Sequence, residues 1–201
     1  GKSTLLNDVV KLMRIHDDDN NVGILAVDPS SQFTNGAILG DRIRMQDLLG
    51  DEGVYIRSMA TRGALGGLSN SVVGAVDLLD SAGFDRVFVE TSGVGQAEID
   101  IAANSYTTVV VLLPGAGDSI QAAKAGILEI ADIIVINKSD YANANLTKSY
   151  VMEMLDLGRY NQSANVNNNN SIGSSELTSD ASEKIGALWD IPIISTVATS
   201  G

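Results

Sequence analysis

The sequence predicts an α/β fold in which a mostly parallel sheet carries helices on both faces. Two observations support this prediction. Short, continuously apolar segments alternate with segments whose apolar residues recur at helical spacing, as is typical of a parallel sheet covered on both sides. Polar motifs follow several apolar segments directly, at the strand ends where such sheets bind ligands. The chain has 201 residues, 44% of them hydrophobic, so we expect a single domain over residues 1–201.

The first half of the chain predicts two helices and three strands. A helix is expected at the amino end, because apolar residues between Leu5 and Met13 recur at helical spacing before the acidic loop at residues 17–21. A second helix is expected from Leu68 to Leu79, with Gly83 ending it. Strands are expected over residues 22–27, 54–56 and 86–90, which are short and mostly apolar.

The second half continues the same alternation and then changes in composition. We expect strands over residues 107–113, 132–136 and 191–195, and helices over residues 120–130 and 146–157. Residues 161–180 are rich in asparagine and serine, which can bury little apolar surface. We therefore expect a mobile surface insertion of about 161–180 before the last strand.

Charge and composition exclude several classes of partner. A net charge of −12 repels the phosphate backbone of nucleic acids, so we expect no nucleic-acid partner. No apolar run approaches the length of a membrane span, and we expect no membrane partner. The chain has no cysteine, which excludes disulfides and thiolate metal sites and fits a cytoplasmic protein, or one of the mitochondrial matrix if the source is eukaryotic.

The first four residues match the end of a phosphate-binding loop. Gly1, Lys2, Ser3 and Thr4 form the tail of the pattern G-x-x-x-x-G-K-[ST], followed by an apolar helix. Backbone N–H groups at a helix start bind phosphate, Lys2 can reach the outer phosphates, and the Ser3 hydroxyl can ligate Mg²⁺. The preceding strand and the first half of this P-loop are expected to lie before Gly1. Taken alone, so short a motif could also be an ordinary helix start.

A second motif predicts which base is bound. Asn137, Lys138 and Asp140 follow a buried strand, as an N-K-x-D guanine site requires. The Asp140 carboxylate can accept hydrogen bonds from N1–H and the 2-amino group of guanine, and adenine offers neither donor. The Lys138 stem can lie over the base while Asn137 braces the loop, and the backbone at Thr196 and Val197 can meet guanine O6. The alternative is a polar turn after a strand, but together the two motifs predict a P-loop GTPase domain that binds GTP and GDP.

Acidic residues between these motifs suggest a Mg²⁺ site. Asp28 and Glu90 end two predicted strands, and Asp41 lies between them in sequence. Gly93 would allow close approach of the backbone to the γ-phosphate. A lone aspartate is more often a helix cap or a turn residue, and that alternative stays open for each of them.

One further loop could report the state of the nucleotide. Asp118 and Lys124 follow a Pro-Gly-Ala-Gly segment at residues 114–117. The simpler alternative is that Asp118 caps the next helix and Lys124 is solvated. Neither residue belongs to a motif shared by all GTPases.

Five longer segments resemble one family. Residues 26–31, 38–45, 61–67, 89–96 and 113–118 are similar to the MeaB/ArgK-type GTPases, which are G-protein chaperones of cobalamin-dependent methylmalonyl-CoA mutase. The resemblance implies a slow GTPase that chaperones or gates cofactor loading of a cobalamin-dependent acyl-CoA mutase and forms a homodimer at full length. It implies catalytic roles for Lys2, Asp28, Asp118 and Lys124, Mg²⁺ ligands among Ser3, Asp28, Asp41 and Glu90, and nucleotide contacts from Gly1, Lys2, Ser3, Thr4, Gly93, Asn137, Lys138, Asp140, Thr196 and Val197.

Two other functions remain as alternatives. A nickel or cobalt metallochaperone GTPase could share the fold, but it should carry clusters of cysteine and histidine, and this chain has no cysteine and one histidine. The older ArgK name implies a small-molecule kinase. Such a kinase would normally use ATP, which Asp140 disfavours.

Overall fold

The fold is seen in a computed structural model that describes residues 1–28, 45–60, 67–91, 99, 101–115, 127–169 and 189–199. Helices and strands alternate along the chain as the sequence predicts. The elements are α1 (Lys2–His16), β1 (Val22–Asp28), η1 (Gln46–Leu48), β2 (Val54–Ala60), α3 (Gly67–Ser81), β3 (Arg86–Thr91), β4 (Val109–Leu112), η2 (Ile127–Ile130), β5 (Ile133–Asn137), α6 (Ala144–Asn169) and β6 (Ile193–Thr196).

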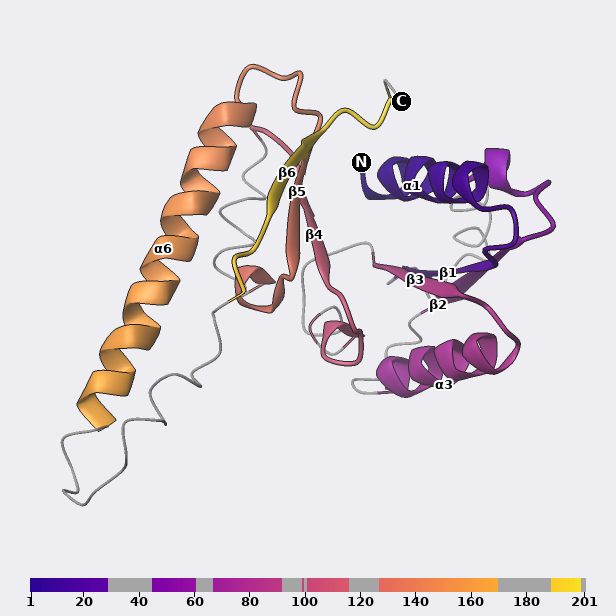
Figure 1. Cartoon of the computed structure of the whole chain (residues 1–201), viewed down its shortest axis with the longest axis horizontal. Coiled ribbons are helices and arrows are strands. Elements are labelled where there is room, and N and C mark those ends of the chain that lie inside the picture. Colours follow the sequence, from indigo (N-terminus) through magenta and orange to yellow (C-terminus); the bar gives the residue numbers. More distant parts are fainter. Residues whose placement is uncertain are drawn as a thin grey trace.

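The described strands form two three-stranded parallel sheets (Figure 1). The first has the order β2-β1-β3, with Val22 of β1 in register with Val54 of β2 and Arg86 of β3. The second has the order β4-β5-β6, with Ile134 of β5 in register with Val110 and Ile193. The predicted parallel α/β fold is thereby confirmed.

Helices α1 and α3 cover opposite faces of the first sheet (Figure 1). On one face, Val10 of α1 is fully buried against Val22 and Ile24 of the central strand. On the other face, Val72 and Leu79 of α3 pack with apolar residues of β1 that point the opposite way. These are Leu25 and Val27. Because side chains alternate across a strand, the continuously apolar β1 supplies both cores at once.

Polar contacts fix the carboxyl end of α1 to the turn before β2. The Arg14 guanidinium donates to both carboxylate oxygens of Asp51 at 2.9 Å and also to the backbone carbonyls of Asp18 and Asn20. This pairing lowers the pKa of the Asp51 carboxyl below its usual range, chiefly through the Arg14 hydrogen bond. Gly53 lies directly against the guanidinium, and a Cβ there would collide with Arg14 Cζ.

In the second sheet, apolar residues of β4 and β5 pack with Val151 of α6 and with η2. Helix α6 runs on to Asn169, beyond the helix end expected at residue 157, so residues 161–169 are helical. The surface insertion expected over about 161–180 stays a prediction. Asparagine and serine are only modest helix formers, but extending an existing helix is much easier than starting one. Residues 170–180 lie outside the described part of the chain.

Other element boundaries differ by a few residues from those predicted. Strand β2 continues from Ile56 to Ala60, and α3 ends at Ser81, just before Gly83, whose φ of 87° is in the left-handed region. Of the helix expected over residues 120–130, the structure describes only the short 3₁₀ helix at Ile127–Ile130.

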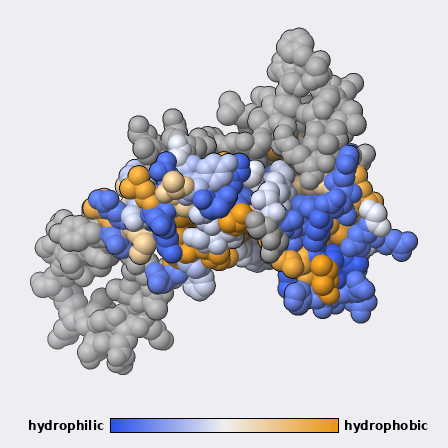
Figure 2. Space-filling model, turned by 90° about the horizontal axis from the view of Figure 1, so that it is seen from above, coloured by the Kyte–Doolittle hydropathy of each residue, from blue (hydrophilic) through white to orange (hydrophobic). Residues whose placement is uncertain are grey.

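The surface over α1 is mostly hydrophilic, with separate hydrophobic side chains between the polar ones (Figure 2). Two apolar residues of α1, Leu12 and Ile15, are exposed at 52% and 77%. Among the described helices, none combines the length and the hydropathy that a membrane span requires.

Candidate functional site

The two predicted nucleotide motifs lie side by side. The amino end of α1 points to the carboxyl end of β5, and the segment that follows β6 lies near it (Figure 1). The Asn137 side-chain amide donates to the Gly1 carbonyl at 3.0 Å. A Cβ on Gly1 would come within 3.0 Å of Leu113 Cδ2 and 3.8 Å of Asn137 Nδ2. The start of the helix is therefore seated between the ends of β4 and β5.

Asn137 is the centre of this junction. Its side-chain oxygen accepts hydrogen bonds from the backbone N–H groups of Lys138 at 2.8 Å and Ala198 at 3.1 Å. It also accepts one from the Thr196 hydroxyl at 3.3 Å. The residue is only 2% exposed, and these bonds satisfy its amide at both ends. Asn137 thus joins the base motif, the helix start and the segment after β6, in agreement with its expected bracing role.

The turn after Asn137 has a fixed backbone. Lys138 adopts the left-handed conformation with φ of 60°, which a non-glycine residue rarely does. Ser139 N–H donates to the Thr196 carbonyl at 3.0 Å, and Tyr141 N–H donates to the Lys138 carbonyl at 3.1 Å. Lys138 and Asp140 are exposed on this turn, where their side chains are accessible to a ligand.

The helix start offers backbone donors. Gly1 is the N-cap of α1 without a side-chain capping bond, and the helix begins with Leu5 N–H donating to the Gly1 carbonyl at 3.1 Å. The first N–H groups of a helix have no intrahelical partner, so they are suited to an anion. Lys2 is half-buried and Thr4 is exposed in this first turn.

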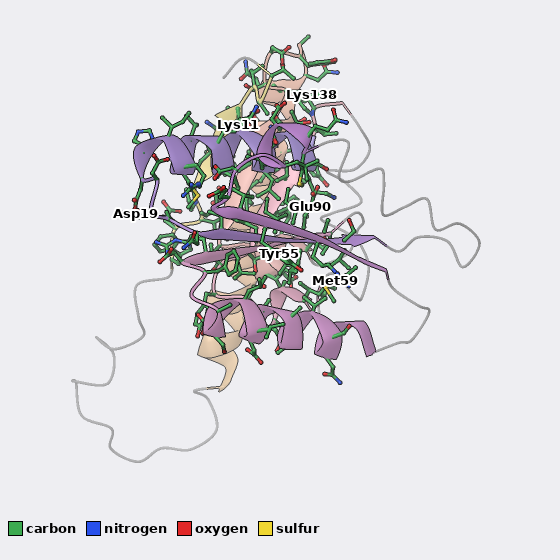
Figure 3. All side chains as sticks on the ribbon, turned by 90° about the vertical axis from the view of Figure 1, so that its right-hand side faces the viewer. Lys11, Asp19, Tyr55, Met59, Glu90 and Lys138 are labelled. Carbon is green, nitrogen blue, oxygen red and sulfur yellow. The ribbon has the colours of Figure 1, made fainter. Side chains whose placement is uncertain are left out.

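Ser3 and Glu90 meet beneath the same helix. The Ser3 hydroxyl donates to Glu90 Oε1 at 2.7 Å, although 87 residues separate them. Figure 3 shows Glu90 below α1 and Lys138 above it. Ser3 is 8% exposed, and Glu90 is in register with Ala26 of β1. A hydroxyl and a carboxylate are the hard oxygen donors that Mg²⁺ prefers, so these two residues fit that ion.

The remaining predicted site residues are described only in part or not at all. Asp28 ends β1, in register with Ala60, and its side chain is outside the described part. Within the described residues, no group of three or more His, Cys, Asp or Glu could hold a metal. The predicted residues that lie entirely outside the description are Asp41, Gly93, Asp118 and Lys124.

Two contacts at this junction were not predicted from the sequence. The Ala198 N–H binds Asn137, although the expected base contacts were at Thr196 and Val197, which are half-buried beside it. Tyr141 places its ring under the Lys138 ammonium, with Nζ 5.7 Å from the ring centroid. Its position directly after Asp140 was a visible signal in the sequence.

Comparison with known proteins gives a consistent picture. One family profile, described as "Methylmalonyl Co-A mutase-associated GTPase MeaB", matches residues 1–201. A Pyrococcus horikoshii protein that carries a GTPase name is 48% identical over all 201 residues, which cover 56% of its own length. GTPase ArgK of Escherichia coli is 43% identical over 143 residues, or 71% of this chain and 43% of ArgK. The mouse protein named methylmalonic aciduria type A homolog, mitochondrial, is 41% identical over 140 residues, or 70% of this chain and 33% of its own. The chain thus spans about half the length of its Pyrococcus relative.

Solved structures show the same fold at low sequence identity. HypB from Helicobacter pylori, in complex with nickel, matches with a TM-score of 0.56 and 18% identity, over 99% of this chain and 74% of HypB. HypB from Archaeoglobus fulgidus, a hydrogenase maturation factor, matches with a TM-score of 0.53 and 19% identity, over 77% of this chain and 70% of that protein.

Proposed function

This chain belongs to the MeaB family of methylmalonyl-CoA mutase-associated GTPases, and we propose that it binds and hydrolyses GTP in the service of a cobalamin-dependent acyl-CoA mutase. In this proposal the protein gates or protects cofactor loading of the mutase, and GTP hydrolysis sets the timing. The location would be the cytoplasm, or the mitochondrial matrix in a eukaryote, and a homodimer is the expected form.

The observation that carries the proposal is the junction around Asn137. A guanine site and a phosphate site act on one nucleotide only if they lie a nucleotide's length apart and are held rigidly. The hydrogen bond from Asn137 to Gly1 and the bond from Ala198 to Asn137 support this arrangement directly. They leave Asp140 exposed at one end of the junction and the start of α1 at the other.

Each residue then has a chemical task. Asp140 selects guanine by accepting from N1–H and the 2-amino group, and Lys138 lies on the base. The backbone N–H groups at the start of α1 and the Lys2 ammonium bind the phosphates. Ser3 and Glu90 would hold Mg²⁺, together with Asp28 and Asp41, and that ion would neutralise phosphate charge.

Regulation by the partner is assigned to a different segment. In this proposal hydrolysis by the protein alone is slow, and binding of the partner brings in a positive charge that neutralises the transition state. A partner would accelerate hydrolysis by reordering the loop that holds Asp118 and Lys124. Turnover should be measured with and without a cobalamin-dependent mutase for the parent, Asp118→Ala and Lys124→Ala. Stimulation that survives in both variants would reject the role given to this loop.

The metallochaperone alternative gains nothing from the fold. Sequence identity to the two HypB proteins is below 20%, so the similarity supports a shared fold and nothing further. Nickel and cobalt sites are commonly built from cysteine and histidine, and this chain has no cysteine and a single histidine. That histidine, His16, contacts the Leu12 carbonyl through Nδ1 at the end of α1.

The deciding experiment for nucleotide choice is calorimetric titration with GDP and ADP. GDP should bind more tightly, because ADP would leave the Asp140 carboxylate without its two donors, at a cost of about 2–4 kcal/mol. An Asp140→Asn variant should shift the preference toward xanthosine diphosphate, whose 2-oxo group accepts from the new amide. Equal affinity of the parent for GDP and ADP would refute the guanine site.

A further inference from the structure

We propose that Tyr141 is a further positioning residue of the base site, which holds the Lys138 ammonium over its ring before a nucleotide arrives. The inference rests on the guanine-nucleotide binding proposed above and adds a residue outside the N-K-x-D motif. Tyr141 is not expected to touch the reacting phosphates, and it would act through the lysine side chain.

The backbone of Lys138 is held by hydrogen bonds on both sides. Lys138 N–H donates to the buried Asn137 side chain at 2.8 Å, and the Lys138 carbonyl accepts from Tyr141 N–H at 3.1 Å. The left-handed backbone of Lys138 is fixed by these bonds, with φ at 60°. A turn closed between residues i and i+3 brings its first and fourth residues close together. The backbone therefore sets Tyr141 beside Lys138.

The ring supplies the second restraint. The Lys138 ammonium lies 5.7 Å from the Tyr141 ring centroid, within the range of a cation–π contact. Tyr141 is 57% exposed and belongs to none of the three apolar clusters found among the described residues. Core packing therefore does not account for an aromatic residue at this position, whereas the contact with Lys138 does.

This contact bears on nucleotide affinity through side-chain entropy. A lysine has more rotamer freedom to lose than almost any other residue when it becomes ordered on a ligand. An ammonium held over the ring has already given up part of that freedom, so less is lost when the lysine stem settles on guanine. If the ring instead competed with the base for the lysine, removing the ring would strengthen nucleotide binding. The two effects differ in sign, and a measurement can separate them.

The test is a double-mutant cycle on GDP affinity, measured by calorimetry. Tyr141→Leu should weaken GDP binding by about two- to fivefold, the factor that corresponds to an exposed cation–π contact. Tyr141→Phe keeps the ring and should restore affinity to within about twofold of the parent. In a Lys138→Met background, Tyr141→Leu should have no further effect, because the ammonium that the ring holds is gone.

Several outcomes would overturn the inference. GDP binding by Tyr141→Leu that is unchanged or tighter than the parent's would contradict positioning, and tighter binding would indicate competition. Equal losses from Tyr141→Leu in the parent and in the Lys138→Met background would indicate a role that does not pass through the lysine. Failure of the proposed function itself looks different, since the parent would then bind GDP no better than ADP.

Discussion

Replacing Asn137 by alanine is the perturbation that best tests how the site is assembled. The side chain makes four hydrogen bonds, to Gly1, Lys138, Thr196 and Ala198, at 2.8–3.3 Å. A typical bond contributes about 0.5–1.5 kcal/mol, and buried backbone groups left without a partner cost more. The bond from Thr196 is the longest, so we assign it the smallest share of the free energy of unfolding. We expect Asn137→Ala to lower the free energy of unfolding by about 2–4 kcal/mol.

The same change should weaken nucleotide binding. Without Asn137, the Lys138 turn loses its link to the helix start, so the base and phosphate contacts are no longer held at a fixed separation. We expect GDP affinity to fall by about tenfold or more, which corresponds to about 1.4 kcal/mol.

The loss of stability is measured by urea unfolding, which can be followed through Trp189, the only tryptophan. Its indole N–H donates to the Asp132 carbonyl at 2.8 Å.

Two further variants divide the effect among the bonds. Asn137→Asp can still accept from Lys138 and Ala198, but it places carboxylate oxygen against the Gly1 carbonyl. It should therefore lose most of the GDP affinity at neutral pH. Thr196→Val removes only the 3.3 Å bond and should cost less than about 1 kcal/mol. If Asn137→Ala unfolds within about 0.5 kcal/mol of the parent and binds GDP normally, the reasoning about this junction is wrong.

Three other predictions concern the metal and the anchorage of α1. Ser3→Ala should raise the Mg²⁺ concentration needed for half-maximal GTP binding by about tenfold or more, and an unchanged Mg²⁺ dependence would remove Ser3 from the ion's ligands. Gly53→Ala forces Arg14 away from its partner and should lower the free energy of unfolding by about 1–2 kcal/mol, whereas Gly50→Ala, with no atom within 4 Å of its Cβ, should change it by less than about 0.5 kcal/mol. Folding lowers the pKa of the Asp51 carboxyl. The ionised carboxylate therefore stabilises the folded protein at pH values above the pKa that Asp51 has in the unfolded chain. This stabilisation is lost as the pH falls through the pKa that Asp51 has in the folded protein. The gap in stability between the parent and Asp51→Asn should therefore shrink in acid, and urea titrations that give a gap independent of pH from neutral to strongly acidic conditions would contradict this.

Much of the fold follows from local pattern. Val22 to Val27 are apolar without interruption, and that alone predicts a strand buried on both faces, which the fully buried Val22, Ile24 and Leu25 confirm. The left-handed glycine after α3 was equally visible, because helices commonly end on such a residue. The boundary that differs most is the end of α6, which is expected at residue 157 and lies at Asn169, because a helix is extended more easily than it is started.

The base preference predicted for this candidate site follows from residue types alone, whereas its geometry depends on contacts between distant parts of the chain. Asp140 after Asn137-Lys138 predicts a preference for guanine because a carboxylate has a fixed set of hydrogen bonds to offer, wherever it lies in space. Residue types alone could not predict two hydrogen bonds of the site. One runs from the Ser3 hydroxyl to Glu90, and the other runs from the Ala198 N–H to Asn137. Those contacts join residues 87 and 61 positions apart, and their distances depend on how α1 packs on the first sheet and how β6 pairs with β5. Periodicity reports which face of an element is buried, whereas packing and strand pairing decide which residues meet across elements.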